Sequence, residues 1–149
     1  MKYAIMMLLA ACGSPHTNTI SVFIGTSEPH EGIIAAAVMD WVATCDLDST
    51  VVFEKMRDVQ TITVLDVDKI GQDDRILGHA QKLTDIPRVT VVVRKDLSDE
   101  DYRFTALHEL GHVWGLSHSK GGLMSPKKTD DDDVSRYCSL VRDNLKGLQ

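Results

Sequence analysis

The 149-residue chain has no internal repeat, no long apolar run after its first residues and no surplus of basic residues. Nothing beyond the N-terminus approaches the roughly 20 consecutive apolar residues that a membrane-spanning helix needs. Lysine and arginine number 16 against 22 aspartate and glutamate residues, which gives a formal net charge of −6. This acidic balance argues against nucleic acid or an anionic membrane surface as the main partner. The length suits one domain with a modest core.

Calcium-binding loops are also lacking. The acidic clusters at 73–74 and 130–133 do not have the ligand spacing of such a loop, so we expect no calcium site. The second cluster is better explained as the start of a helix, where carboxylates accept hydrogen bonds from free N–H groups and interact favourably with the helix dipole. Apolar spacing predicts that this last helix covers 134–145, with Tyr137 and Cys138 on its apolar face.

Cysteine is scarce, and the first of the three lies in an N-terminal segment that resembles an export signal. A lysine precedes a short apolar stretch, and Leu-Ala-Ala-Cys at 9–12 is similar to a bacterial lipobox, in which Cys12 would carry the lipid. An ordinary secretory signal or an apolar first strand is the alternative. The expected organisation is a lipoprotein signal peptide at 1–11, a lipid-anchored tether at 12–18 and a folded domain at 19–149.

The other two cysteines, Cys45 and Cys138, are free to pair if Cys12 is lipidated. An oxidising compartment would permit a disulfide, which would tie the first helix to the last and close a loop of roughly ninety residues. Two buried free thiols are the competing interpretation, and the sequence does not decide between them. Neither cysteine has another cysteine nearby, so neither is a convincing nucleophile or zinc ligand.

Histidine is also scarce, but three of the six histidines lie in one motif. Residues 108–118 read H-E-L-G-H-V-W-G-L-S-H, which has the form H-E-x-x-H-x-x-G-x-x-H. His108 and His112 are about 6 Å apart along a helix axis and lie on one face, so both imidazoles can reach one metal ion. His118 would complete the set and leave the fourth position of a tetrahedral zinc open to water. The pattern therefore predicts a catalytic zinc rather than a closed structural one.

Two further positions of the motif have separate roles. Glu109 points about 100° away from the histidine face but stays beside the metal, where it would act as general base for the zinc-bound water. Gly115 can take a positive φ, end the helix and turn the chain so that His118 returns to the metal. A polar helix with fortuitously spaced histidines is the alternative, but it accounts poorly for Gly115 and His118 together.

The motif resembles that of the metzincin metallopeptidases, and within them the matrixin (matrix metalloproteinase-like) catalytic domain. The resemblance implies that the three histidines bind zinc and that Glu109 is the general base. It covers about residues 19–145, but only 108–126 match specifically.

A Met-turn beneath the zinc is the second feature that the resemblance implies. Gly-Gly-Leu-Met-Ser-Pro at 121–126 is similar to the matrixin pattern A-L-M-Y-P, which makes Met124 the candidate methionine. One more core methionine is the alternative. Ser125 replaces the usual tyrosine, and the tyrosine ligand of astacin-like and serralysin-like relatives has no obvious counterpart. In matrixins an aspartate hydrogen-bonds beneath this turn, and Asp132 or Asp133 is the match.

The order of the predicted elements favours an α+β fold with a mostly parallel sheet. Ser98 is expected to cap the helix that carries the zinc motif, and Trp41 lies on the apolar stripe of the first helix. The resemblance refines this to a zincin-like domain with a twisted sheet, an antiparallel edge strand and about three helices. Strands are predicted over 19–25, 51–54, 61–67 and 88–94, and helices over 31–45, 99–114 and 134–145.

The segment R-I-L-G-H-A at 75–80 resembles the matrixin segment L-A-H-A, a sheet-edge strand along which an extended substrate pairs. In many matrixins this histidine binds a second, structural zinc. The partner ligands of that site are not found here, and His16 and His30 lie far upstream. We therefore expect His79 at the sheet edge or surface, and one catalytic zinc without a second.

These features together predict a zinc-dependent endopeptidase that hydrolyses peptide bonds in proteins, with Glu109 as its base. A non-catalytic zinc-containing surface lipoprotein and a hydrolase of cell-wall peptides are the alternatives. The expected partner is a protein or peptide substrate, not nucleic acid. We expect a monomer in the bacterial cell envelope, held to a membrane only by its N-terminal lipid, or else a secreted protein.

Overall fold

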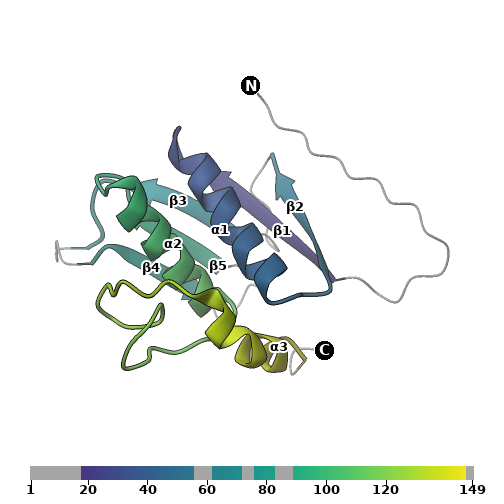
Figure 1. Ribbon diagram of the computed structural model, residues 1–149. Helices are drawn as coiled ribbons and strands as arrows, with labels where there is room; N and C mark the ends of the chain where they lie inside the picture. The colour runs from purple at the N-terminus through teal and green to yellow at the C-terminus, as the bar shows by residue number, and fades with distance from the viewer. Residues whose placement is uncertain (1–17, 56–61, 72–75, 83–88, 147–149) are drawn as a thin grey trace.

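The computed structural model describes residues 18–55, 62–71, 76–82 and 89–146 (Figure 1). Cys12, with the expected signal peptide and nearly all of the expected tether, lies outside these residues, as do His16 and the acidic pair at 73–74. Within the described ranges, no helix combines the length and the apolar content that crossing a bilayer requires.

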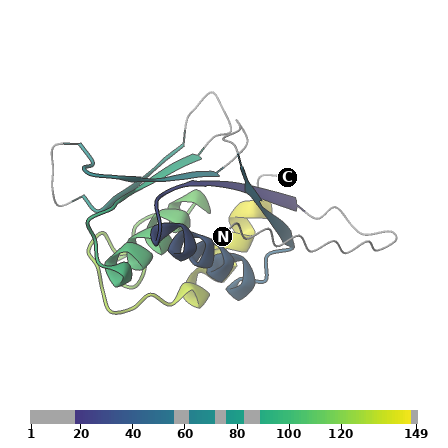
Figure 2. The same cartoon turned by 90° about the horizontal axis from the view of Figure 1, so that it is seen from above.

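Three helices lie on one face of a five-stranded sheet (Figures 1 and 2). The strand order is β2-β1-β3-β5-β4, and all pairs are parallel except the edge pair β4 and β5. This confirms the predicted α+β fold with a mostly parallel sheet and an antiparallel edge strand. The elements are β1 (Asn18–Gly25), α1 (His30–Thr44), β2 (Ser49–Glu54), β3 (Ile62–Val67), β4 (Gly78–Lys82), β5 (Val89–Arg94), α2 (Asp99–Val113), the 3-10 helix η1 (Val134–Tyr137) and α3 (Cys138–Lys146).

Most predicted elements agree with the observed ones to within two residues, and the last helix and the edge strand differ more. The expected last helix begins as η1, which the Asp133 side chain caps by accepting a hydrogen bond from the Ser135 N–H, and it becomes α-helical only at Cys138. The edge strand begins at Gly78, paired with Val93 of β5, so residues 76 and 77 of the expected 75–80 segment precede it, and Arg75 lies outside the described residues.

The core lies between the sheet and the helices. Trp41 of α1 is fully buried, and its indole N–H donates to the Leu107 carbonyl of α2 over 3.0 Å. This bond fixes α1 to α2 one residue before His108. The other fully buried core side chains of the strands, α1 and α2 include Val22, Ile34, Val38, Val64, Val91, Val93, Leu107 and Leu110.

A disulfide joins Cys45, just after α1, to Cys138 at the start of α3, across 93 positions of sequence. The sequence left a disulfide and two free thiols open, and the structure has the disulfide. Helix α3 also satisfies carbonyls at the ends of the other helices: Arg142 donates to the Cys45 carbonyl and Asn144 to that of Trp114, each over 3.1 Å. The short C-terminal helix thus holds both long helices at their ends.

The N-terminal end of α1 is fastened to the sheet by a polar cluster. The Ser27 hydroxyl donates to the Asp66 carboxylate at the end of β3 over 3.0 Å, and the His30 Nδ1 lies 3.2 Å from the same oxygen. The His30 ring stacks on Tyr102 of α2 with centroids 3.9 Å apart. Burial alone would raise the pKa of Asp66, but the bonds from His30 and Ser27 outweigh it and lower that pKa below its ordinary value.

Candidate metal centre

Helix α2 carries most of the candidate site and has a well-defined start. The Ser98 side chain accepts the Asp101 N–H over 3.2 Å, and acidic residues fill the first turn. The helix ends at Val113, and Gly115 then takes a φ of +81° while its N–H donates to the His112 carbonyl. A left-handed residue just past the last turn redirects the chain, which brings His118 back beside α2.

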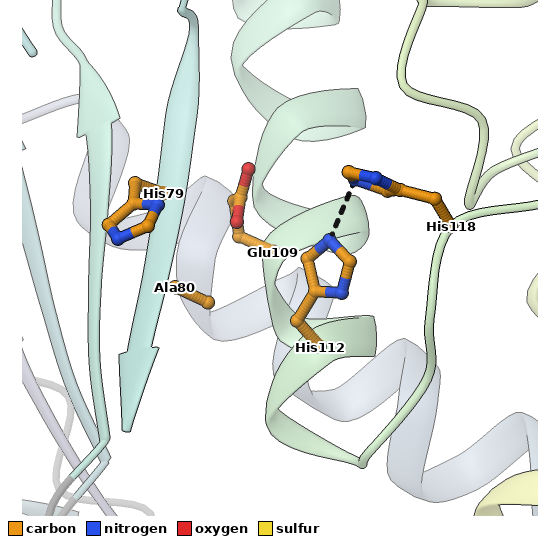
Figure 3. A pocket seen from close by; sticks show the side chains of 5 residues that line it. All are labelled: His79, Ala80, Glu109, His112 and His118. Carbon is orange, nitrogen blue, oxygen red and sulfur yellow. Dashed lines mark hydrogen bonds between the residues drawn. The ribbon is translucent and has the colours of Figure 1, made fainter. Parts of the chain in front are cut away.

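The three histidines of the motif converge through their Nε2 atoms. The Nε2 of His112 lies 3.2 Å from that of His108 and 3.1 Å from that of His118, and the remaining pair is 3.3 Å apart. Nitrogens bound tetrahedrally to zinc at roughly 2.0–2.1 Å are about 3.3 Å from each other. The three rings are therefore close enough to hold one metal ion. Figure 3 shows two of them, His112 and His118, facing each other across the hollow.

The hydrogen bonds of the rings decide where the lone pairs point. The Nδ1 of His108 lies 2.8 Å from the Leu123 carbonyl, and the Nδ1 of His112 lies 2.8 Å from that of Leu116. Because a carbonyl only accepts, each Nδ1 carries a proton, and in the neutral form each ring turns an unprotonated Nε2 toward the others. Clustered lone pairs without a proton between them repel unless a cation lies among them. The donor set thus fits a divalent metal such as zinc.

Burial of His108 favours the form that a metal needs. Its environment lowers the pKa of His108, first through burial and also through the neighbouring His112 and His118, while the hydrogen bond to Leu123 opposes the shift. The lowered pKa keeps the ring neutral at neutral pH. A neutral imidazole is the ligand form, so protons do not compete strongly for this position.

Glu109 lies beside the triad with only 7% of its surface exposed. It lines a hollow together with His79, Ala80, His112 and His118 (Figure 3). Burial raises the pKa of Glu109 to about 7, and a hydrogen bond from the Ala80 backbone opposes the shift. A cation held by the three histidines would favour the carboxylate and pull this pKa down again.

The carboxyl group of Glu109 is pressed against the backbone of β4. A methyl group added at Gly78 would lie 2.8 Å from the Glu109 Cγ, 2.9 Å from its Oε1 and 2.5 Å from the Thr105 Cγ2. Such distances are far inside van der Waals contact, so only a residue without a side chain lets α2 and β4 approach this closely. The sequence offered no sign of this role, because it depends on a contact between distant segments.

His79 is exposed in β4, as expected for an edge residue. Since Gly78 faces α2, alternation along the strand turns His79 to the other face of the sheet. Figure 3 accordingly shows its ring on the side of β4 away from Glu109, so His79 borders the hollow without turning its ring toward Glu109. Among the described residues, it belongs to no group of metal-ligating side chains.

Met124 is fully buried directly beneath α2. Its sulfur would collide with a methyl group placed on Gly111, the residue just before His112, so the absence of a side chain there makes room for it. The turn around Met124 is closed by a hydrogen bond of 3.0 Å from the Ser125 N–H to the Gly122 carbonyl.

The expectation that Asp132 or Asp133 supports this turn is wrong. Asp132 is exposed and pairs with Arg103, and Asp133 caps η1. The Tyr137 hydroxyl instead accepts the Met124 N–H over 3.3 Å. The sequence placed Tyr137 on an apolar helix face, and the only available signal was that a buried tyrosine hydroxyl usually finds a partner.

No protein-family model matches the chain, and no curated protein is significantly similar to it. The assignment of this site therefore rests on the motif, the distances and the hydrogen bonds of the chain itself.

Proposed function

We propose that the protein is a zinc-dependent endopeptidase of the metzincin type. The observation that carries the proposal is the meeting of three Nε2 atoms, 3.1 to 3.3 Å apart, beside a buried carboxyl group. Three neutral imidazoles leave one coordination position open, and a site that serves only structure has no use for a base next to the metal. His108, His112 and His118 would hold the ion.

Zinc bound there would lower the pKa of a coordinated water toward about 7 and polarise a peptide carbonyl. The chain supplies the remaining chemistry. The Glu109 carboxylate accepts the proton of the attacking water on one of its oxygens and then donates it to the nitrogen of the departing amine. Its contact with Gly78 and the bond from Ala80 keep the carboxyl group at one side of the hollow.

The edge strand β4 supports a peptide as the substrate. In the described sheet, β4 pairs with β5 on one side only, so its other edge has backbone groups free to bind an extended chain. The hollow lined by Glu109, His112 and His118 opens beside this strand. An extended peptide paired with β4 would pass in front of the metal and its base.

The cell envelope remains the proposed location, with Cys12 as the lipidated residue. This part of the proposal rests on the lipobox-like sequence at 9–12 alone. A Cys12→Ala chain expressed in bacteria should lose the label of a radioactive or clickable fatty acid and leave the membrane fraction. Equal labelling of both chains would exclude this anchor.

Peptidase activity tests the central proposal. The zinc-loaded chain is compared with its Glu109→Gln variant on an unstructured protein substrate, with zinc content measured in both. We expect equal zinc and a kcat lower by about 10²–10⁴-fold in the variant, because proton transfer is lost while the ligands remain. Glu100→Gln, an exposed change on the same helix, is the matched control and should cleave normally.

Other outcomes separate the alternatives. Cleavage of cell-wall peptides but not of proteins would favour the cell-wall hydrolase. Zinc-loaded protein that cleaves neither would contradict the peptidase and leave a zinc-containing binding module.

A further inference from the structure

The third histidine of the triad lacks the support that the other two have. His108 and His112 each direct an Nδ1 proton to a backbone carbonyl, whereas no hydrogen bond to the Nδ1 of His118 is found in the part of the chain that the structure describes. His118 is also exposed and lies on no helix. Metal-bound histidines are usually oriented by such a bond. The position of His118 therefore depends on the loop that follows it.

That loop, residues 119–124, serves two of the three histidines. It is closed by a bond of 2.9 Å from the Ser119 N–H to the Met124 carbonyl and by one of 2.6 Å from the Ser119 hydroxyl to the Gly121 carbonyl. It begins right after His118, and its Leu123 carbonyl orients His108. A shift of the loop would displace one ligand and release another.

The Tyr137 hydroxyl lies inside this loop. It donates to the Gly121 carbonyl over 3.3 Å, accepts the Met124 N–H over 3.3 Å and lies 3.5 Å from the Ser119 hydroxyl. A methyl group added at Gly122 would come within 2.7 Å of it. One oxygen atom thus contacts the loop at its beginning, middle and end.

The ring that carries this hydroxyl is held by the core. Tyr137 is half-buried and lies 6.5 Å from the Trp41 ring, centroid to centroid. The next residue, Cys138, is bonded to Cys45 after α1. The loop is therefore tied through Tyr137 to the buried Trp41 and to the disulfide, while its own residues at 120–121 are exposed.

We propose that Tyr137 is a positioning residue for the metal centre. Its hydroxyl fixes loop 119–124, and through that loop it holds His118 in place and keeps the Leu123 carbonyl on His108. The inference rests on the metal centre of the proposed function but not on the peptidase activity, so it stands or falls on metal binding.

Zinc affinity of the full chain tests this inference, measured by competition with a chromophoric chelator. Tyr137→Phe keeps the ring and removes only the hydroxyl. The matched control is Tyr102→Phe, because the Tyr102 hydroxyl is buried without a hydrogen-bond partner in the described structure. We expect Tyr137→Phe to weaken zinc binding about tenfold or more, the range found when a residue that orients a ligand is lost, and Tyr102→Phe to leave it unchanged.

Two further measurements separate positioning from a general effect on folding. The visible spectrum of the cobalt-substituted protein reports ligand geometry, and it should change in Tyr137→Phe and not in Tyr102→Phe. The rate at which zinc-loaded protein loses metal to excess chelator should rise only in Tyr137→Phe, and this rate requires no folded metal-free state.

Equal affinity, spectrum and release rate in the two variants would overturn the inference. A Tyr137→Phe chain that does not fold even with zinc would also overturn it, because the hydroxyl would then serve the fold and not the loop. If the unsubstituted chain binds no zinc, the proposed metal centre itself is contradicted. If it binds zinc but cleaves nothing, only the peptidase fails and the role of Tyr137 is still decided.

Discussion

At the scale of single residues, the candidate site depends as much on missing side chains as on present ones. Gly111 leaves room for Met124 beneath the metal ligands, and Gly78 leaves room for Glu109 against β4. Both glycines work by close approach of two segments. Because neither glycine has a side chain, Met124 and β4 can lie close against α2.

Replacing Gly78 should therefore impair Glu109 specifically. In Gly78→Ala, the new methyl group would push the Glu109 carboxyl and the Thr105 methyl aside. We expect kcat to fall about 10²-fold, because misplacement of a catalytic group by about 1 Å has costs of this order, with zinc content unchanged. Steady-state kinetics with metal analysis provide the measurement.

Gly32→Ala is the matched control for this change, since a methyl group there meets nothing within 4 Å. It should leave kcat unchanged and stabilise α1 slightly. Normal turnover by Gly78→Ala would show that Glu109 has more freedom than the packing implies.

Asp66 gives a second prediction at this scale, for the pH dependence of stability. Its pKa is lowered in the folded protein, so its contribution is fully present above its ordinary value of 3.8 and is lost as the pH falls through the lower folded value. The titratable groups around it are His30 of α1, Tyr102 of α2 and Lys95 after β5.

The comparison is with Asp66→Asn, which keeps the shape but cannot titrate. We expect the unsubstituted chain to have the higher free energy of unfolding. The difference from Asp66→Asn should be constant from about pH 5 to pH 6 and should shrink toward pH 3. Urea denaturation at each pH measures it. An advantage that stays constant down to pH 3 would show that the polar cluster does not depend on the charge of Asp66.

The sequence predicted the three histidines that could hold a metal ion but not the contacts that support them, and the reason is physical. His108, Glu109 and His112 follow from the geometry of one helix, and Gly115 and His118 follow from how a helix ends. Tyr137 and Gly78 act through contacts between segments that are distant in the chain. Such contacts leave no local pattern, and the family pattern suggested an aspartate where this chain uses a tyrosine.

At the scale of elements, the strands and long helices were predictable because each has its own pattern. Runs such as V-T-V-V-V-R in β5 are β-branched, and α1 has an apolar stripe at helical spacing. Helix α2 was predictable from its Ser98 cap and from the histidine motif. The order of the strands in the sheet and the side on which α3 packs had no such signal. The division of the last helix into η1 and α3 also had no signal in the spacing of its apolar residues.

Helix α3 is short, and the disulfide is its strongest attachment. Removing it in a Cys45→Ala/Cys138→Ala chain should lower the free energy of unfolding by about 3–5 kcal/mol, because the unfolded chain regains the freedom of a long loop. Thermal or urea denaturation measures this loss.

A phosphine reductant provides the control for that experiment. It should bring the unsubstituted chain to the stability of the double variant and leave the variant unaffected. If the unsubstituted chain without reductant is no more stable than the double variant, Arg142 and Asn144 hold α3 without help from the disulfide.

At the scale of the whole molecule, a metal ion would add a link between parts that are otherwise joined by packing, hydrogen bonds and ion pairs. His108 and His112 belong to α2, whereas His118 belongs to the segment that leads to η1 and α3. A ligand that binds the folded state alone stabilises it in proportion to the logarithm of its concentration.

Zinc should therefore raise the free energy of unfolding, by about 2.7 kcal/mol when its free concentration is about 100 times the Kd. Denaturation with zinc and with a chelator measures the difference. In His118→Ala, which retains two ligands on one helix, most of this gain should disappear. A gain that survives the substitution would place the binding site elsewhere.

The position of the disulfide in the sequence has a consequence for the integrity of the molecule. Cys45 and Cys138 enclose β2 to η1, and every residue of the metal centre lies between them. A single backbone cut anywhere in this interval would produce two fragments that stay covalently joined. A nicked molecule would run as one band on a gel without reductant and as two with it, and its histidines could not diffuse apart. If the chain is the peptidase proposed above, one accidental cut by its own activity would leave the fragments that carry the three histidines joined.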